Sequence, residues 1–185
     1  MTALYGVADL AIGTGESVAR LRLFDGPLDL SWKHCAITSD FVAELVALRY
    51  RVSRNTYKEV RHNVGYLTNE LVENAVKFRV AGEIIVEASL EANTFRAKVS
   101  NFIDKETATQ FQGLLSEIST GDPGELLIER IEANAIGGES GSGLGLLTLM
   151  SDYGVHFAWV FGSAEQTGAI ALETYASIAV PDMSN

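Results

Sequence analysis

The sequence has little cysteine, few basic residues and no long apolar run. Cys35 is the single cysteine, which excludes a disulfide within the chain and favours a reducing compartment. Fourteen Lys and Arg residues against 24 Asp and Glu residues give a formal net charge of −10, so nucleic acid and anionic membranes are not expected partners. No apolar run reaches the roughly 18–20 residues that a membrane-spanning helix needs. Because the first residues also lack the basic segment of a signal peptide, we expect a soluble, cytoplasmic protein.

The composition is that of a globular domain. Hydrophobic residues make up 47% of the sequence and charged residues 21%. A length of 185 residues suits one core, so we expect a single domain over residues 1–185. Residues 1–18 mix small and polar types and are expected to form a loosely packed arm. The acidic balance does not exclude a nucleotide, because backbone amides at a helix N-terminus can hold phosphates.

Short segments of alternating apolar and polar residues predict strands in pairs. Three pairs of this kind are separated by short turn-like sequences such as "DGP" and "EANT". The paired segments are residues 19–24 with 28–32, 83–90 with 95–102, and 155–162 with 168–180. Pairs joined by short turns favour an antiparallel or mixed sheet over a parallel one.

Helical spacing separates these strand pairs. Ser39 or Asp40 can cap a first helix, and residues 56–78 carry the longest helical pattern. The predicted buried stripe of the first helix is Phe41, Leu45, Leu48 and Val52. Residues 104–135 are polar and helix-prone with a break at "STGDPG", and residues 144–153 predict an apolar helix. The order predicts an α/β (α+β) two-layer sandwich, with a mixed, mostly antiparallel sheet and helices on one face.

Polar residues on the longest helix are spaced to share one side. In "NELVENAVK", residues 69–77, Glu70 and Asn74 lie one turn apart and Lys77 follows three residues later. A carboxylate, an amide oxygen and an ammonium in this row can activate a hydroxyl, hold magnesium and meet a phosphate. Taken alone, the spacing also fits a solvated helix face with a Glu73–Lys77 pair.

A glycine cluster precedes the apolar helix. In "GSGLGL", residues 141–146, alternate glycines let consecutive backbone N–H groups point at one anion, and the helix dipole adds favourable potential. The alternative is a flexible loop before a core helix. A dinucleotide fingerprint does not fit, because the preceding segment is helical and polar instead of the first strand of a βαβ unit.

Together, these two segments resemble a known family. "NELVENAVK" resembles the N box, and "GSGLGLLTLMSDYG" the second glycine box, of the GHKL (histidine kinase-like) ATP-binding fold, also called the Bergerat fold. The boxes occur in the family order, and the resemblance covers roughly residues 40–180. In its short length the chain is most similar to the anti-sigma factor serine kinases and the SiaB-type kinases. Those relatives phosphorylate a serine or threonine of a STAS-domain partner.

The resemblance implies a role for each matching residue. Glu70 matches the family's general base, Asn74 its magnesium-binding asparagine, and Lys77 a basic residue near the phosphates. Residues 104–140 match the mobile ATP lid. The residues that match the phosphate-binding loop are Gly141, Ser142, Gly143, Leu144 and Gly145. The implied cofactors are ATP or ADP together with Mg²⁺.

The family's first glycine box is degenerate in this chain. Within "VSNFIDKET", Asn101 stands where the family has the aspartate that binds the adenine amino group, and Ile103 replaces the first glycine. An asparagine oxygen can still accept a hydrogen bond from that amino group. The usual close approach of the base depends on the missing glycine.

Two functions are therefore kept open. The first is a serine/threonine protein kinase in which Glu70 deprotonates the acceptor hydroxyl of a STAS-domain, anti-sigma factor antagonist-like partner, in a partner-switching pathway. The second is a non-catalytic, nucleotide-responsive module that sequesters a regulatory protein such as a sigma factor. A third possibility is a pseudo-ATPase that binds no nucleotide, and it would show no thermal shift with ATP or ADP. Related anti-sigma kinases pair, so a homodimer is a further expectation, and Trp159 is expected in the core or on a partner surface.

Overall fold

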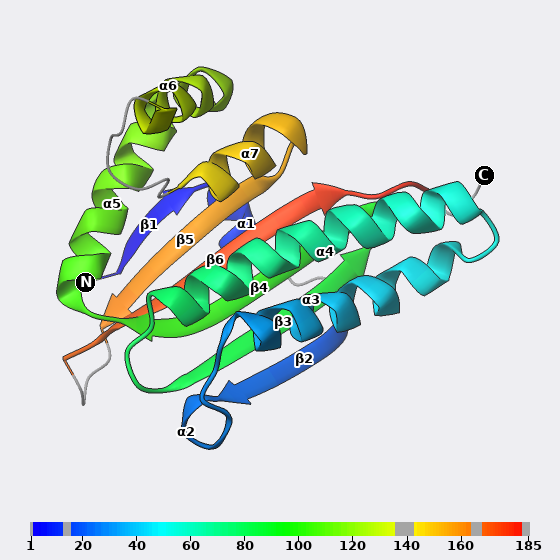
Figure 1. Ribbon diagram of the computed structural model, residues 1–185, viewed down its shortest axis with the longest axis horizontal. Coiled ribbons are helices and arrows are strands. Elements are labelled where there is room, and N and C mark those ends of the chain that lie inside the picture. The colour runs from blue at the N-terminus through cyan, green and yellow to red at the C-terminus, as the bar shows by residue number, and fades with distance from the viewer. Residues whose placement is uncertain (1, 13–15, 136–142, 164–167, 183–185) are drawn as a thin grey trace.

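One antiparallel sheet organises the molecule (Figure 1). The computed structural model describes residues 2–12, 16–135, 143–163 and 168–182. In these residues six strands lie in the order β1-β5-β6-β4-β3-β2, and every neighbouring pair is antiparallel. The strands are β1 (Ala3–Gly6), β2 (Ser17–Phe24), β3 (Glu83–Glu91), β4 (Thr94–Ile103), β5 (His156–Ser163) and β6 (Ile170–Ala179). The expected two-layer α+β class is confirmed, with an antiparallel sheet in place of a mixed one.

The longer helices cover one face of this sheet (Figure 1). Helices α3 and α4 lie side by side across β2, β3 and β4, while α5 and α7 lie over the half of the sheet that contains β1 and β5. The helices are α1 (Ala8–Ile12), α2 (Asp25–Leu28), α3 (Trp32–Ala47), α4 (Arg54–Lys77), α5 (Lys105–Thr120), α6 (Pro123–Ala135) and α7 (Leu144–Asp152), with a short 3₁₀ turn at Leu48–Tyr50. None of the helices in the described ranges combines the length and apolar character needed to span a bilayer.

The core lies between α4 and the covered face of the sheet. Alternate residues of β3 and β4 point toward the helices and are buried, as the predicted alternation requires. On α4, Leu67, Leu71 and Ala75 form the facing stripe and are at most 5% exposed. Burying each large apolar side chain contributes about 1.5–3 kcal/mol, so this contact fixes α4 on the sheet. The predicted β3–β4 and β5–β6 hairpins, the long helix and the break between α5 and α6 are confirmed.

The other face of the sheet carries charges. Lys98 forms ion pairs with Glu173 at 2.6 Å and with Glu87 at 3.7 Å, and Arg20 lies 3.4 Å from the same Glu87. These side chains alternate with the buried residues of their strands, so they lie on the face that the long helices leave uncovered. A ligand cavity lined by apolar groups therefore belongs on the helical side.

The predicted strand at residues 28–32 is wrong. Residue 28 ends α2, and Trp32 begins α3. Asp25 accepts a hydrogen bond from the backbone N–H of Leu30 at 3.1 Å, and Ser31 forms a capping box with His34. These local hydrogen bonds stop the chain from continuing as a strand, and β2 pairs with β3 instead.

The predicted start and buried stripe of α3 are also wrong. The helix begins before Ser39 and Asp40, and it turns the opposite side toward the core. The predicted stripe, Phe41, Leu45, Leu48 and Val52, is exposed to solvent. The buried residues near it are Val42, Ala43, Val46 and Ala47. Small residues determine which side of α3 faces the core. A Cβ added at Gly65 of α4 would lie only 3.3 Å from the Cβ of Ala43, so α3 and α4 are packed closely at this point. Close helix packing outweighs the larger apolar side chains.

In the described parts of the expected arm, residues 2–12 and 16–18, the chain is packed on the sheet. β1 pairs with β5 at the edge of the sheet, and α1 contacts β5 and β6. Gly6 allows this approach, since its φ is +79° and a Cβ there would overlap the carbonyl oxygen of Phe157. The segment therefore completes the sheet next to the strand that carries Trp159.

Candidate functional site

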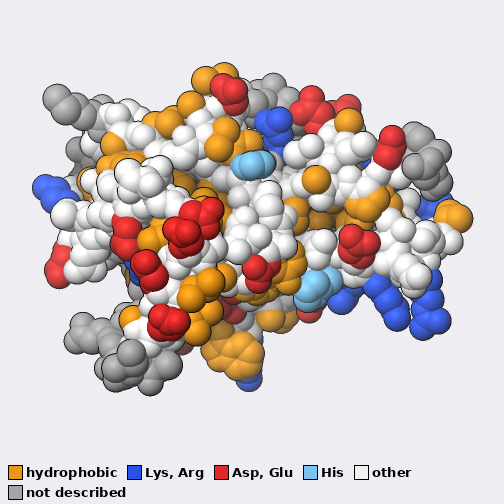
Figure 2. Space-filling view, turned by 90° about the horizontal axis from the view of Figure 1, so that it is seen from above, with side chains coloured by type: hydrophobic (Ala, Val, Ile, Leu, Met, Phe, Trp, Pro, Cys, Tyr) orange, Lys and Arg blue, Asp and Glu red, His pale blue; other side chains and the backbone are white. Residues whose placement is uncertain are grey.

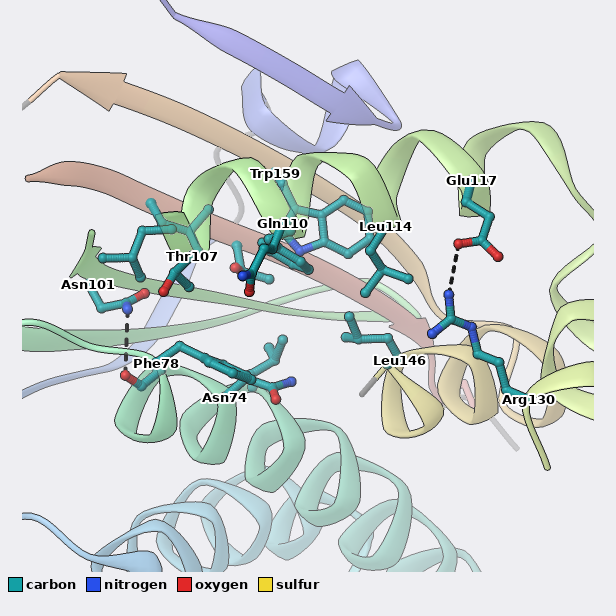
Figure 3. A pocket seen from close by; sticks show the side chains of 17 residues that line it. Asn74, Phe78, Asn101, Thr107, Gln110, Leu114, Glu117, Arg130, Leu146 and Trp159 are labelled. Carbon is teal, nitrogen blue, oxygen red and sulfur yellow. Dashed lines mark hydrogen bonds and ion pairs between the residues drawn. The ribbon is translucent and has the colours of Figure 1, made fainter. Parts of the chain in front are cut away.

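A cavity of about 340 Å³ lies between α4, the sheet and helices α5 and α7 (Figure 3). Its volume falls within the range of about 300–1,000 Å³ typical of small-molecule sites. Strands β4, β5 and β6 form its floor, and residues of α4 line one side. Residues of α5 and Arg130 of α6 line the opposite side. The cavity thus brings together segments that are far apart in the sequence.

Asn101 marks one end of the cavity. Its side chain is 5% exposed, and its Nδ2 donates to the carbonyl oxygen of Ala75 at 3.5 Å. No hydrogen bond found among the described residues uses its Oδ1, which leaves an acceptor for a ligand. Leu71 and Ile103 add apolar walls at the same cavity. Ile103 is 1% exposed, so its side chain is fully packed at the position where the sequence resemblance compared it with a glycine.

Gly143 and Arg130 mark the other end. Gly143 is the N-cap of α7 and has a φ of +89°, a conformation that favours glycine. Its carbonyl oxygen accepts from the N–H of Leu147 at 3.0 Å, which starts the helix. A Cβ at Gly143 would lie 3.7 Å from Nη1 of Arg130, so the guanidinium lies against this glycine. Arg130 also forms an ion pair with Glu117 of α5 at 2.8 Å. A helix N-terminus beside a guanidinium is a suitable place for an anion.

Asn74 lies between these ends on α4, whereas Glu70 is not one of the residues that line the cavity. Asn74 lines the cavity, and its side-chain amide takes part in no hydrogen bond found in the described part of the chain. Glu70, one turn earlier, is half-buried and lies against Gly145, because a Cβ added at Gly145 would overlap its carboxylate. Burial, and next the nearby Glu73 carboxylate, raise the pKa of Glu70 above its usual value. A carboxyl group with a raised pKa is better suited to accept a proton near neutral pH.

The remaining predicted residues lie elsewhere. Lys77 is exposed, and its Nζ lies 4.9 Å from the centroid of the Phe78 ring, so it does not line the cavity. Leu144 begins α7 and is half-buried, whereas Gly141 and Ser142 lie outside the described residues. The predicted lid contains α5 and α6, and its last residues, 136–140, also lie outside the described ranges.

Helix α5 belongs partly to the core. Its residues Ala108, Leu115 and Ile118 are buried, and Phe111 contacts Trp159 edge-on with ring centroids 6.0 Å apart. The root of the predicted lid is therefore packed on the sheet. Helix α6 contacts α7, and it carries no buried apolar residue in its described part. If the cavity opens, α6 should therefore move more easily than α5.

Arg130 and Trp159 are two of the lining residues that sequence reasoning did not identify as part of a site. Arg130 lies within the predicted lid, where no motif distinguishes it from other charged residues. Trp159 lines the cavity with a side chain that is 2% exposed, and its indole Nε1 has no hydrogen-bond partner among the described residues. The alternation of Phe157, Trp159 and Phe161 predicts that they share one face of β5, but it does not reveal that this face borders a cavity.

Comparisons with known proteins identify the fold. No protein-family model matches the sequence, and no curated protein matches it significantly. The structure is similar to a chain in the crystal structure of the SiaB–SiaC complex from Pseudomonas aeruginosa, with a TM-score of 0.61. The similarity covers 88% of this chain and 91% of that chain at 12% sequence identity. At this identity the two chains share a fold, and the sequence match carries no further conclusion.

Proposed function

We propose that this protein binds ATP and ADP and transfers a phosphoryl group to a serine or threonine of a STAS-domain partner in a partner-switching pathway. One observation carries the proposal. Asn74 of the predicted N box and Gly143 of the predicted glycine box line the same cavity, with Asn101 at its far end. Three positions matched to one family from separate segments meet around a space of suitable size.

The polar groups of the cavity fit a nucleotide. The free Oδ1 of Asn101 accepts from an amino group on the base, and Leu71, Ala75 and Ile103 provide apolar contact for the rings. At the other end, the N-terminus of α7 and the Arg130 guanidinium face the phosphates. The Asn74 amide oxygen would hold Mg²⁺ when the nucleotide is bound. Arg130 takes the place that the sequence assigned to Lys77.

Glu70 carries the proton transfer. When bound, ATP supplies the phosphoryl group and Mg²⁺ neutralises its charge. Glu70 lies against Gly145 in the first turn of α7, beside the phosphate end. Its raised pKa suits a general base that takes the proton of the acceptor hydroxyl. Gly145 is needed as glycine because a side chain there would displace the carboxylate.

A protein partner is part of this proposal. The structure with the similar fold is a complex of two proteins, which supports assembly with a regulator. Figure 2 shows Asp and Glu side chains gathered over the left part of the viewed face, where Figure 1 places α6, with Lys and Arg at the right end. The described acidic residues of α6 are Glu125, Glu129 and Glu132. A partner that docks beside α6 is therefore expected to present basic side chains.

The second function, a binding module without catalysis, is favoured by two changes in the first glycine box. Ile103 fills the place of the family's glycine, and Asn101 is a weaker acceptor than the family's aspartate. Both changes reduce the fit to an adenine base. Such a module would bind nucleotide to change its affinity for a regulator, without labelling it.

Phosphoryl transfer separates the two functions. The experiment incubates the protein with radiolabelled ATP, Mg²⁺ and a purified STAS-domain protein, and measures ADP affinity by calorimetry. Glu70→Ala should keep ADP affinity within about threefold and lose transfer by about 10²–10⁴-fold. Glu59→Ala, an exposed glutamate of the same helix, is the matched control and should keep both.

Each other result has a definite meaning. If Glu70→Ala transfers phosphate as fast as the parent, the assigned base is wrong. ADP binding without any labelling by the parent supports the binding module. Absence of ADP binding rejects both functions.

A further inference from the structure

The indole ring of Trp159 is held rigidly in the floor of the cavity. It stacks on Phe157 with ring centroids 5.2 Å apart and meets Phe111 of α5 edge-on at 6.0 Å. Its strand, β5, lies between β1 and β6, so it is not an edge of the sheet. With a stacked and an edge-on aromatic neighbour and almost no solvent exposure, the direction of its N–H is set by packing.

This N–H has no protein partner. The side chain is 2% exposed, and Nε1 forms no hydrogen bond with any described residue. Gln110 is the nearby polar side chain of α5 in Figure 3, and its Nε2 donates to Glu106 at 3.4 Å. Buried tryptophan N–H groups usually have an acceptor, and an unpaired one is a cost that a ligand can remove. The acceptor is therefore expected to enter with the ligand.

The strand register places Trp159 relative to Asn101. Trp159 lies opposite Thr174 on β6, and Asn101 of β4 lies opposite Leu172 of the same strand. The two residues are thus two strands and two residues apart on the same face. Strand spacing and rise give about 12 Å between their Cα atoms, before the side chains reach into the cavity. A base with its sugar spans such a distance, whereas the phosphates belong at Gly143 and Arg130.

We propose that Trp159 recognises the nucleoside part of the ligand by donating its Nε1–H to an acceptor there. The inference rests on the proposed nucleotide binding and adds a residue to it. The acceptor is a ring nitrogen of the base or a hydroxyl oxygen of the ribose, and either can accept one hydrogen bond from the indole N–H. Asn101 would then accept from the ligand at one position and Trp159 would donate at another, so the cavity selects a nucleoside that offers both groups.

Calorimetry with ADP tests this role. Trp159→Phe keeps an aromatic ring between Phe111 and Phe157 but removes the donor, and it should weaken ADP binding about tenfold. Trp32→Phe is the matched control, because Trp32 is 67% exposed and lies outside the cavity, and its ADP affinity should equal that of the parent. If Trp159→Phe binds ADP as tightly as the parent, the inference is wrong while nucleotide binding stands. If the parent does not bind ADP, the proposed function and the inference both fail.

Analogues of ADP then identify the acceptor. The set is 1-deaza-, 3-deaza-, 7-deaza-, 2′-deoxy- and 3′-deoxy-ADP. The analogue that lacks the accepting atom should bind the parent about tenfold more weakly than ADP, yet bind Trp159→Phe as well as ADP does. If, for every analogue, the loss of binding free energy caused by the analogue and the loss caused by Trp159→Phe are additive, the proposed hydrogen bond is contradicted.

Fluorescence gives a test that does not need the Trp159 variant to fold. The sequence contains two tryptophans, so Trp32→Phe leaves Trp159 as the single one. Hydrogen bonding of the indole N–H to ADP should shift its emission to longer wavelength at saturation. Unchanged emission in a protein that calorimetry shows to be saturated would overturn the inference.

Discussion

The cavity has two walls of different character. The first wall comes from α4 and the sheet, and its residues Leu71, Asn101, Ile103 and Trp159 are at most 5% exposed. The second wall comes from α5 and α6, and its residues are half-buried or exposed. One of its contacts is the ion pair of Glu117 with Arg130, whose side chains are 51% and 25% exposed. The first wall is part of the hydrophobic core, and the second is a cover laid over it.

Because of this difference, the two walls should contribute differently to the stability of the fold and to the opening of the cavity. A change in the first wall removes contacts from the core and from the site together. Within the cover, α5 is anchored by the buried Ala108, Leu115 and Ile118, whereas α6 has no buried apolar residue in its described part. A change in α6 therefore removes few buried contacts, and α6 can open at a small fraction of the global unfolding free energy. The same division would let a fixed floor hold the proposed ligand while the neighbouring surface changes its shape for the proposed partner.

The largest expected effect is on stability, from matched leucine deletions in the two walls. Leu71→Ala should lower the unfolding free energy by about 2–5 kcal/mol, because it leaves a cavity in the core. Leu114→Ala, in the half-buried cover, should cost about 1 kcal/mol. Urea unfolding measures both, and equal losses would remove the distinction between the walls.

A second prediction concerns ligand binding by the first wall and uses the residue proposed to contact the base. Asn101→Ala should weaken ADP binding about tenfold, because it removes the acceptor for the amino group. Its effect on stability should be small, since its hydrogen bond to Ala75 is long, at 3.5 Å. Ser100→Ala is the control, because this neighbour points to the opposite face of β4. ADP affinity that is unchanged in Asn101→Ala would move the base away from this end.

The sequence predicts the first wall better than the cover. Alternation and helical spacing locate β3, β4, α4 and the terminal hairpin, because these elements bury one side against a single core. The same rule fails for α3, where Ala43 and Gly65 allow a close helix contact and leave larger apolar residues outside. Helix propensity and residue spacing do not indicate how closely two helix backbones can approach each other.

The candidate site shows the same limit. Asn74 and Gly143 belong to local motifs that can be read from spacing, and they do line one cavity. Arg130 and Trp159 reach it through tertiary packing, from segments without a motif. Lys77 has the right spacing on α4, but its side chain lies over Phe78 and not in the cavity. The spacing of residues on a helix predicts which of them share one face, but it does not predict which other element packs against that face.

A smaller effect is expected from removing the ion pair between Glu117 and Arg130 in the cover. Glu117→Gln should change the unfolding free energy by less than about 1 kcal/mol, because a half-exposed pair contributes little. Amide hydrogen exchange in α6 should nevertheless become faster, while exchange in the buried part of α4 stays the same. Glu129→Gln, an exposed glutamate of α6 that forms no ion pair among the described residues, should leave both rates unchanged. Equal acceleration in α4 and α6 would mean that the two walls open as one unit.

The smallest expected effect is the pH dependence that Glu70 adds where the two walls meet. Its pKa is raised in the folded protein above the usual 4.5, so the folded state binds this proton more tightly than the unfolded state does. Ionisation of Glu70 therefore destabilises the fold as pH rises above 4.5 and through the raised value. Glu70→Gln should match the parent below this range and become relatively more stable above it, in urea unfolding over a pH series. Glu59→Gln, at an exposed position of the same helix, is the matched control. A difference between Glu70→Gln and the parent that stays constant with pH would mean that the carboxylate is solvated in the folded protein, and that it lacks the desolvated environment a base at this site requires.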